Sequence, residues 1–320
     1  MAQPRCIDAP TPTLSLVCPM YDEADMLSAF EARLMPVLQG LGESFEIVCI
    51  NDGSRDGTQA ALDAWHRRDP RVRVFELSRN FGKEAALSCG IDHARGRAVI
   101  PIDADLQDPP ELIPEMLRLW KSGYEVVLAQ RLDRSSESLL KRGSAAWFYR
   151  THNRLAEVPI PENVGDYRLL DRRVVEALKR LPERRRFMKG LFAWVGFRQV
   201  SISYKREPRR HGKTKFSGWR LWNLALEGIT SFSTVPLRIW TYAGALVAGL
   251  SFCYGLFIVA LALFDGRDTP GYASLITVVL FLGGLQLVGL GVIGEYLGRV
   301  HQEVQQRPVY LVRESSDDAS

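Results

Sequence analysis

Five short apolar segments in the first part of the chain each end in polar or charged residues, and a helical stretch follows each of the first four. These segments are Leu14–Cys18, Phe45–Ile50, Val72–Leu77, Ala98–Ile102 and Glu125–Ala129. Strands that alternate with helices of this length predict a mostly parallel, doubly wound α/β sheet, because parallel neighbours need a crossover connection. The alternation therefore places this region in the α/β class.

Polar side chains follow all five predicted strands. The carboxyl ends of parallel strands lie at one edge of the sheet, and open α/β sheets bind their ligands at that edge. The residues concerned are Asp22, Asp52, Arg79, Asp103 and Arg131. We therefore expect a ligand site built from these strand ends.

The stretch AVIPIDADLQDPPEL, residues 98–112, carries the strongest chemical signal. Asp103 and Asp105 are two residues apart, so on an extended chain their side chains point the same way. Like charges at this spacing repel unless a cation lies between them, and hard oxygen ligands suit Mg²⁺ or Mn²⁺. Pro109 and Pro110 then begin a helix, where a missing N–H costs nothing. The pattern favours a metal site over a solvated acidic turn.

The sequence Asp52-Gly53-Ser54 follows the second predicted strand. Glycine permits a tight turn there, and the carboxylate could accept a hydrogen bond from a nucleotide base or a ribose hydroxyl. Ser54 and Asp56 also suit the N-terminus of a helix. Nucleotide binding and helix capping are compatible, and both remain open at this stage.

Two later runs, Ile239–Phe264 and Tyr272–Gly294, contain no charged residue. At about 1.5 Å per residue, either run in helical form would cross a bilayer core of about 30 Å. A buried hairpin is the alternative, but both runs exceed the length of about 18 residues that is typical of a membrane span. We predict two transmembrane helices, at about residues 239–264 and 272–296.

The charges around these runs predict the orientation in the membrane. Arg238 precedes the first run, and Arg299 and Arg307 follow the second, whereas the connecting residues 265–271 are nearly neutral. Positive residues stay on the cytoplasmic side, so both termini and the N-terminal region are expected in the cytoplasm. Residues 1–12 do not resemble a secretory signal peptide, and the cysteines show no CxxC spacing, which fits a reducing compartment.

Basic residues gather in two further regions. Residues 131–150 mix cations with Leu, Trp and Phe, which suits either a membrane surface or an ordinary surface helix. Residues 184–216 include the densest basic region. Residues 216–232 have the pattern of an amphipathic helix, and their tryptophans favour an interfacial helix over a core helix. The tail after Val312 is predicted to be disordered.

Four motifs in order, V-C-P-M-Y-D-E, I-N-D-G-S-R-D-G-T, N-F-G-K and D-A-D-L-Q-D-P-P, resemble those of the family 2 glycosyltransferases. The similarity is greatest to the branch that uses polyprenyl phosphates, and it covers nearly the whole chain. The resemblance implies a GT-A fold, that is, an α/β domain that binds a nucleotide sugar. One departure is Asp22, where the family usually has Asn.

The resemblance also implies roles for individual residues. The set that would bind the nucleotide sugar is Pro19, Tyr21, Glu23, Asp52, Lys83 and Asp103. Asp105 and Gln107 would hold Mg²⁺ or Mn²⁺ on the donor diphosphate, where the cation neutralises charge on the departing nucleotide. The catalytic set implied in this way is Asp103, Asp105, Asp166 and Arg131.

The acceptor side rests on the resemblance as well. Arg131 would face the acceptor phosphate, and Arg206, Arg209 and Lys215 lie in a segment, R-x-x-R-x-x-G-x-T-K-F, that resembles the family's acceptor loop. Asp166, in G-D-Y-R-L-L, matches a carboxylate that serves as a base in relatives with a hydroxyl acceptor. A lipid phosphate has a second pKa of about 6 and is mostly ionised at neutral pH, so Asp166 is assigned to positioning.

The chain is thus predicted to contain a cytoplasmic GT-A domain (1–215), an interfacial helix (216–236), two transmembrane helices (237–298) and a cytoplasmic tail (299–320). The predicted reaction is inverting transfer of one sugar, by default glucose from UDP-glucose, to undecaprenyl or another polyprenyl phosphate at the inner membrane. GDP-mannose, UDP-aminoarabinose derivatives and UDP-N-acetylated sugars remain open as donors.

Three other functions fit the sequence less well. A processive polysaccharide synthase would carry a Q-x-x-R-W motif, which this sequence lacks, and more spans. A membrane scaffold would have no use for the acidic cluster. A nucleic-acid partner is not expected, because the basic runs flank the membrane segments and lack aromatic stacking repeats. Small residues in the second span, Gly283, Gly284 and Gly289, favour close helix packing and a homo-oligomer.

Overall fold

The computed structural model describes residues 11–132, 164–184, 186, 188–204 and 271–317, together with scattered positions between 240 and 260. The predicted interfacial helix at 216–236 lies outside the described residues, as does nearly all of the basic stretch at 131–150. The same holds for the predicted phosphate-binding residues Arg206, Arg209 and Lys215.

The described part of the chain is built on an eight-stranded mixed sheet with the order β7-β5-β6-β4-β1-β2-β3-β8. The strands are β1 (Leu14–Met20), β2 (Phe45–Asn51), β3 (Val72–Leu77), β4 (Ala98–Pro101), β5 (Val126–Arg131), β6 (Val164–Asp171), β7 (Gln199–Tyr204) and β8 (Val312–Ser315). The helices are α1 (Ala24–Gly40), α2 (Thr58–Arg68), α3 (Lys83–His93), η1 (Pro110–Leu112), α4 (Ile113–Lys121), α6 (Arg172–Lys179), α7 (Met188–Trp194) and α10 (Tyr272–Val304).

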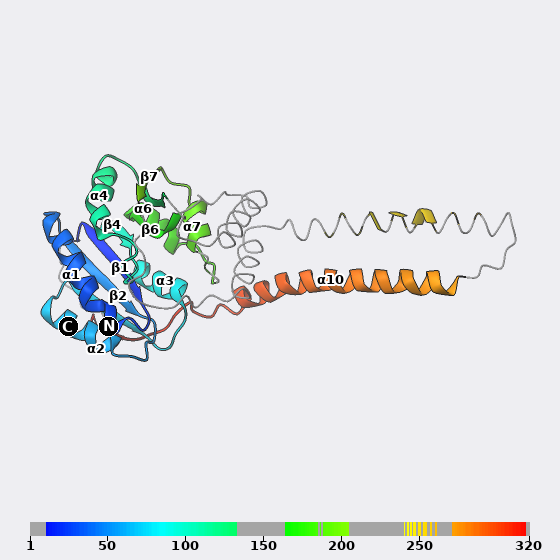
Figure 1. Ribbon diagram of the computed structural model, residues 1–320, viewed down its shortest axis with the longest axis horizontal. Helices are drawn as coiled ribbons and strands as arrows, with labels where there is room; N and C mark the ends of the chain where they lie inside the picture. The colour runs from blue at the N-terminus through cyan, green and yellow to red at the C-terminus, as the bar shows by residue number, and fades with distance from the viewer. Residues whose placement is uncertain are drawn as a thin grey trace, which may run out of the picture.

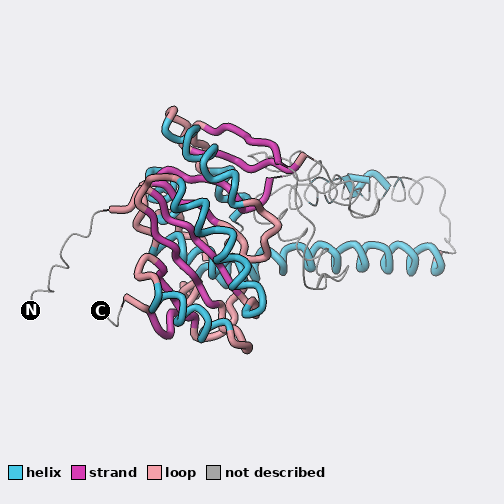
Figure 2. The backbone as a smooth tube through the Cα atoms, turned by 60° about the vertical axis from the view of Figure 1, so that its left-hand side comes forward, coloured by secondary structure: helices cyan, strands magenta, loops and turns pink. Residues whose placement is uncertain are grey.

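Helices cover both faces of the sheet, so the doubly wound prediction is confirmed (Figures 1 and 2). α1, α2 and α4 pack on one face, where Phe30 and Trp65 meet edge to face with ring centroids 6.4 Å apart. α3, α6 and α7 pack on the other face. There α3 lies so close to the sheet that a Cβ at Gly90 would be 2.2 Å from Val17 Cγ1, which explains a glycine inside this helix.

The five predicted strands are all present, with ends within about two residues of their expected positions. The sheet is parallel from β4 through β1 and β2 to β3, and β5 pairs with β7 in parallel. It is not parallel throughout, because β6 runs antiparallel between β4 and β5. The sequence did not predict β6 as a strand, because Asp166 and Arg168 interrupt its apolar residues.

The predicted disorder of the tail after Val312 is wrong for residues 313–317, the part of the tail that the structure describes. β8 pairs antiparallel with β3, where Phe75 lies opposite Ser315 and Leu77 opposite Val312. The edge of β3 would otherwise present unpaired backbone N–H and C=O groups, which a partner strand satisfies. The segment after α10, drawn in red in Figure 1, therefore returns to the sheet that also contains β1.

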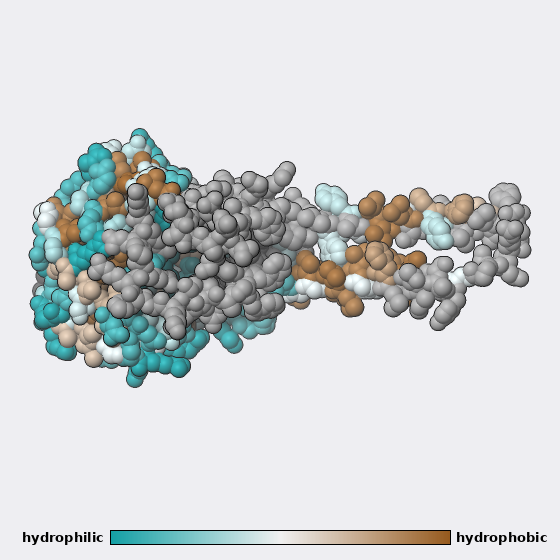
Figure 3. All heavy atoms as spheres, viewed as in Figure 1, coloured by the Kyte–Doolittle hydropathy of each residue, from teal (hydrophilic) through white to brown (hydrophobic). Residues whose placement is uncertain are grey.

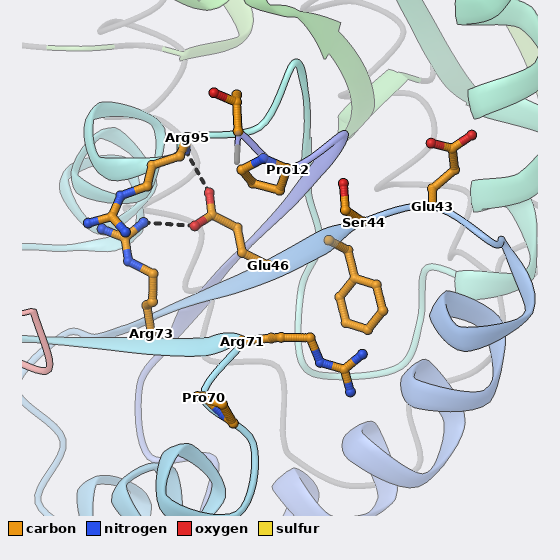
Figure 4. Close-up of a pocket in the computed structure, with 10 residues that line it drawn as sticks. Pro12, Glu43, Ser44, Glu46, Pro70, Arg71, Arg73 and Arg95 are labelled. Carbon is orange, nitrogen blue, oxygen red and sulfur yellow. Dashed lines mark hydrogen bonds and ion pairs between the residues drawn. The ribbon is translucent and has the colours of Figure 1, made fainter. Parts of the chain in front are cut away.

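A buried cluster of charges at the amino ends of β2 and β3 holds this returning segment. Arg73 Nη1 lies 2.9 Å from Glu46 Oε2, and the Arg95 amide donates to Glu46 Oε1 (Figure 4). The same guanidinium donates to Asp317, just beyond β8, at 2.9 Å. A cavity of about 470 Å³ opens beside these residues. It lies at the amino edge of the sheet, opposite the edge where the ligand site is predicted.

α10 extends away from the sheet domain, and hydrophobic side chains gather along it (Figures 1 and 3). Within the described residues, one helical segment, Phe281–Val304, is long and apolar enough to cross a membrane, and almost none of it is buried in the protein. The predicted second span therefore lies within α10, which continues past its expected end. The first span stays a prediction, since its residues are described only in part. Gly289 accommodates Trp240, whose Nε1 would be 2.1 Å from a Cβ.

Replacing Arg73 should destabilise the protein strongly. Its side chain is 8% exposed, and Arg73→Met would leave Glu46 and Asp317 without their shared cation. We expect the free energy of unfolding to fall by about 3–5 kcal/mol, measured by denaturant unfolding in detergent with tryptophan fluorescence. The matched control is Arg313→Met, whose exposed ion pair with Glu76 at 3.5 Å should contribute less than about 0.5 kcal/mol. Equal stability of the two variants would contradict this role of Arg73.

Candidate functional site

The loops after β1 and β2 are joined at the carboxyl edge of the sheet. The Asp22 amide donates to Ser54 Oγ at 3.0 Å, and the Arg55 amide donates to Asp22 Oδ1 at 2.8 Å. Asp22 has a φ of 53°, a left-handed conformation that Asn and Asp adopt more readily than other non-glycine residues. Asp in place of the usual Asn therefore preserves this turn.

Three predicted donor-binding residues belong to the same region. Pro19 lies within β1, opposite Ile50 of β2. Tyr21 follows the strand, and Glu23 precedes α1, where its amide donates to Thr58 Oγ1 at 3.0 Å. The structure thus gathers these residues beside the Asp52 turn.

Asp52 follows β2 and is only 3% exposed. Its two carboxylate oxygens accept hydrogen bonds from the Phe81 amide at 2.7 Å and the Gly82 amide at 2.9 Å. Burial raises the pKa of Asp52, and the two amides oppose that shift. Gly53 has a φ of 65°, and a Cβ there would be 2.5 Å from the Arg79 carbonyl carbon. Asp52 therefore anchors the N-F-G-K loop. The sequence predicted a contact between Asp52 and a nucleotide, but it did not predict this structural role.

Lys83, the first residue of α3, joins two carboxylates from different parts of the sheet. Its Nζ lies 2.7 Å from Asp103 Oδ2 and 2.9 Å from Asp166 Oδ2. Burial lowers the pKa of Lys83, but the two carboxylates outweigh burial and raise it. Burial raises the pKa of Asp166, but Lys83 and Lys189 outweigh burial and bring it to about 2. Lys83 and Asp166 are therefore both charged at neutral pH.

Glu84, the next residue of α3, is a member of this site that the sequence did not reveal. Burial and the neighbouring charge of Asp166 raise the pKa of Glu84 to about 7. One of its carboxylate oxygens accepts a hydrogen bond from the Met188 amide at 3.1 Å, so Glu84 links α3 to the start of α7. No motif pointed to it, because its position depends on the packing of these two helices.

The loop after β4 holds the predicted metal ligands. The Gln107 amide donates to Asp105 Oδ1 at 3.1 Å. Gln107 is 6% exposed, and its side-chain oxygen Oε1 is buried without a hydrogen-bond partner. Within the described residues, no group of three or more His, Cys, Asp or Glu side chains could hold a metal. A buried acceptor that lacks a donor suits a cation as its partner, so Asp105 and Gln107 fit an ion whose other ligands come from a diphosphate.

Arg131, at the end of β5, is half-buried and belongs to a hydrogen-bonded group with two buried residues. Its Nε donates to the Tyr204 hydroxyl at 3.3 Å, and that hydroxyl donates to Asp108. Of these three residues, the sequence predicted a role only for Arg131. Tyr204 ends β7 as Arg131 ends β5, so the strand-end rule could have found it if β7 had been recognised as a strand.

Comparison with known proteins agrees with this geometry. A family model described as glycosyl transferase family 2 matches residues 15–179, and one described as GtrB C-terminal hairpin matches residues 235–300. An uncharacterized glycosyltransferase of Synechocystis sp. is 54% identical over 93% of this chain and 94% of its own length.

Two further relatives carry more specific names. The SfII prophage-derived bactoprenol glucosyl transferase of Shigella flexneri is 50% identical over 94% of this chain and 98% of its own length. A prophage bactoprenol glucosyl transferase homolog of Escherichia coli strain K12 is 49% identical over the same shares. The first family match contains the loops after β1, β2, β3 and β4 that form the site. The chain is a glycosyltransferase and belongs to glycosyl transferase family 2.

Proposed function

We propose that the protein transfers one sugar, by default glucose from UDP-glucose, to a polyprenyl phosphate at the cytoplasmic face of the inner membrane. The observation that carries this proposal is the similarity, along almost the whole chain, to proteins named bactoprenol glucosyl transferase. Bactoprenol is a polyprenol, so its phosphate is the acceptor that these names imply. The end of α10 contacts the sheet domain, where the Arg184 amide donates to Glu303 Oε1 at 3.1 Å, and this contact supports a substrate held at a membrane surface.

A pair of transmembrane helices is part of the proposal. β7 and β8 belong to one sheet, so the chain between Tyr204 and Val312 must begin and end on the same side of any membrane that it crosses. If α10 crosses once, a second crossing is required, and residues 239–264 supply the only other run that is long and apolar enough. The match to a C-terminal hairpin model supports the same arrangement. The positive flanks favour a cytoplasmic sheet domain.

We place the nucleotide sugar across the joined loops of β1 and β2. Asp52 fixes the N-F-G-K loop, and Tyr21 and Glu23, which lie beside the turn, would bind the nucleotide. Asp105 and Gln107 would hold Mg²⁺ or Mn²⁺, which would neutralise charge on the diphosphate when bound. Lys83 places a positive charge between Asp103 and Asp166, so these carboxylates keep one geometry when the donor binds.

An oxygen of the acceptor phosphate would attack the anomeric carbon as the bond from that carbon to the departing nucleoside diphosphate breaks, which inverts the configuration of the carbon. A pKa of about 2 makes Asp166 a poor proton acceptor at neutral pH. The phosphate does not require a base, since it is already mostly ionised. Asp166 therefore positions Lys83 and the acceptor, while Arg131 binds the acceptor phosphate.

A homo-oligomer is the remaining element of the proposal. Gly283, Gly284 and Gly294 of α10 have no described atom within 4 Å of the position that a Cβ would take. Small residues permit close approach of helices in membranes. A second copy of the chain could pack against α10 at these positions.

The test of the proposed function is transfer from a panel of radiolabelled nucleotide sugars to undecaprenyl phosphate by the purified full-length protein in detergent. We expect labelled lipid from UDP-glucose, with a β-linked product from the α-linked donor. Label from a different donor would correct the sugar. Retained configuration would exclude direct displacement, and no label from any donor would exclude polyprenyl phosphate as the acceptor.

Loss of the Lys83 ammonium should impair transfer. In Lys83→Met, Asp103 and Asp166 would repel each other without a shared cation, and we expect kcat to fall about a hundredfold. Lys121→Met is the matched control, since the Lys121 side chain is 49% exposed, close to the 46% of Lys83, and pairs with Glu43 away from the site. Steady-state assays of both variants would settle the matter, and equal rates would remove Lys83 from the mechanism.

Metal removal should abolish transfer, and Mn²⁺ or Mg²⁺ should restore it. Asp105→Asn should raise the metal concentration that gives half-maximal activity by about tenfold or more. Asp63→Asn serves as control, because Asp63 contacts Gln59 on α2 outside the metal loop. Transfer that persists in excess EDTA would argue against a metal role for Asp105 and Gln107.

The pH dependence should distinguish positioning by Asp166 from proton removal. With an ionised phosphate as nucleophile, kcat/KM should rise as pH increases through about 6. Asp166→Asn should lower the rate and keep the same apparent pKa. A rate in Asp166→Asn that no longer rises over this range would instead identify Asp166 as the base.

A further inference from the structure

Tyr204 lies between a cation and a carboxylate at the edge of the site. In the parallel register of β5 and β7 it is the partner of Arg131. Its hydroxyl accepts a hydrogen bond from Arg131 Nε at 3.3 Å and donates one to Asp108 Oδ1. Tyr204 and Asp108 are 5% and 3% exposed. Water therefore has little access to the hydrogen bond between Tyr204 and Asp108, whereas the one from the half-buried Arg131 is only partly shielded.

The direction of these hydrogen bonds follows from the chemistry of the groups. An ionised carboxylate can only accept, and a guanidinium can only donate. The phenol proton must therefore point to Asp108, which leaves an oxygen lone pair for Arg131. Burial and the charge of Asp108 raise the pKa of Tyr204, so the phenol keeps its proton at neutral pH.

The backbone of β6 bounds the same guanidinium on another side. A Cβ at Gly165 would lie 3.1 Å from Arg131 Nη2, which is tighter than most such contacts. The guanidinium thus fits against a glycine in β6 and a hydroxyl in β7, and its freedom to change rotamer is reduced. Preorganised cations bind an anion with less loss of entropy.

We propose that Tyr204 is a positioning residue, which uses Asp108 as an anchor to orient the Arg131 guanidinium toward the acceptor phosphate. The inference rests on the proposed function. Asp108 directly follows Gln107, a predicted metal ligand, in the loop after β4.

The chain offers a matched control in Tyr167. Its ring packs edge to face against Tyr204, with centroids 6.3 Å apart, and is 1% exposed. Its hydroxyl donates to the Pro109 carbonyl at 2.8 Å, away from Arg131. Tyr204→Phe and Tyr167→Phe therefore remove the same atom from neighbouring buried rings, and only the first removes a partner of Arg131.

The experiment measures KM for undecaprenyl phosphate and for the donor in the full-length enzyme and these two variants. Tyr204→Phe should raise the acceptor KM about tenfold and leave the donor KM within about twofold, whereas Tyr167→Phe should change neither KM by more than that. In an Arg131→Gln background, Tyr204→Phe should have no further effect on the acceptor KM, because residues that act through one another are not additive.

Equal acceptor KM values for Tyr204→Phe and Tyr167→Phe would overturn the inference. It would also be overturned if the double variant raised the acceptor KM by the product of the two single-variant effects of Tyr204→Phe and Arg131→Gln. Both outcomes leave the proposed function intact, since the unaltered enzyme is active in the same assay. If the unaltered enzyme transfers no sugar to undecaprenyl phosphate, the proposed function fails and this inference fails with it.

Discussion

The ammonium group of Lys83 holds the site together, because it forms ion pairs with both Asp103, in the loop after β4, and Asp166, in β6. Its position depends in turn on a second interaction. Asp52 binds the amides of Phe81 and Gly82, which directly precede α3 and its first residue Lys83. A buried carboxylate at the end of β2 thus determines where the cation lies, so the loops of three neighbouring strands act as one unit.

The central strands and the edge at which ligands bind could be predicted from the sequence. Buried parallel strands appear as short apolar runs, and the polar residue at the end of each run is a local signal. Asp52 and Asp103 were predicted in this way, and Asp105 was predicted from its spacing of two residues from Asp103. The resemblance to a family then added Lys83 and Asp166, whose ion pair no local pattern could reveal.

The features that the sequence did not show depend on contacts between distant residues. β6 carries Asp166 and Arg168 among apolar residues, so its sequence pattern is ambiguous. Its identity as a strand depends on pairing with β4 and β5. β8 is short and polar, and its pairing needs the free edge of β3 and the charge of Arg73. Tyr204 and Glu84 likewise gain their roles from packing, because their partners lie on other elements.

The return of β8 to the sheet also affects how the protein is made. The contact between Arg73 and Asp317 joins residues that are 244 positions apart, and both apolar runs lie between them. At about 5–20 residues per second, the ribosome needs on the order of ten to fifty seconds to synthesise that interval. β8 can pair with β3 only after α10 has been synthesised, so the sheet of the catalytic domain is completed at the end of synthesis.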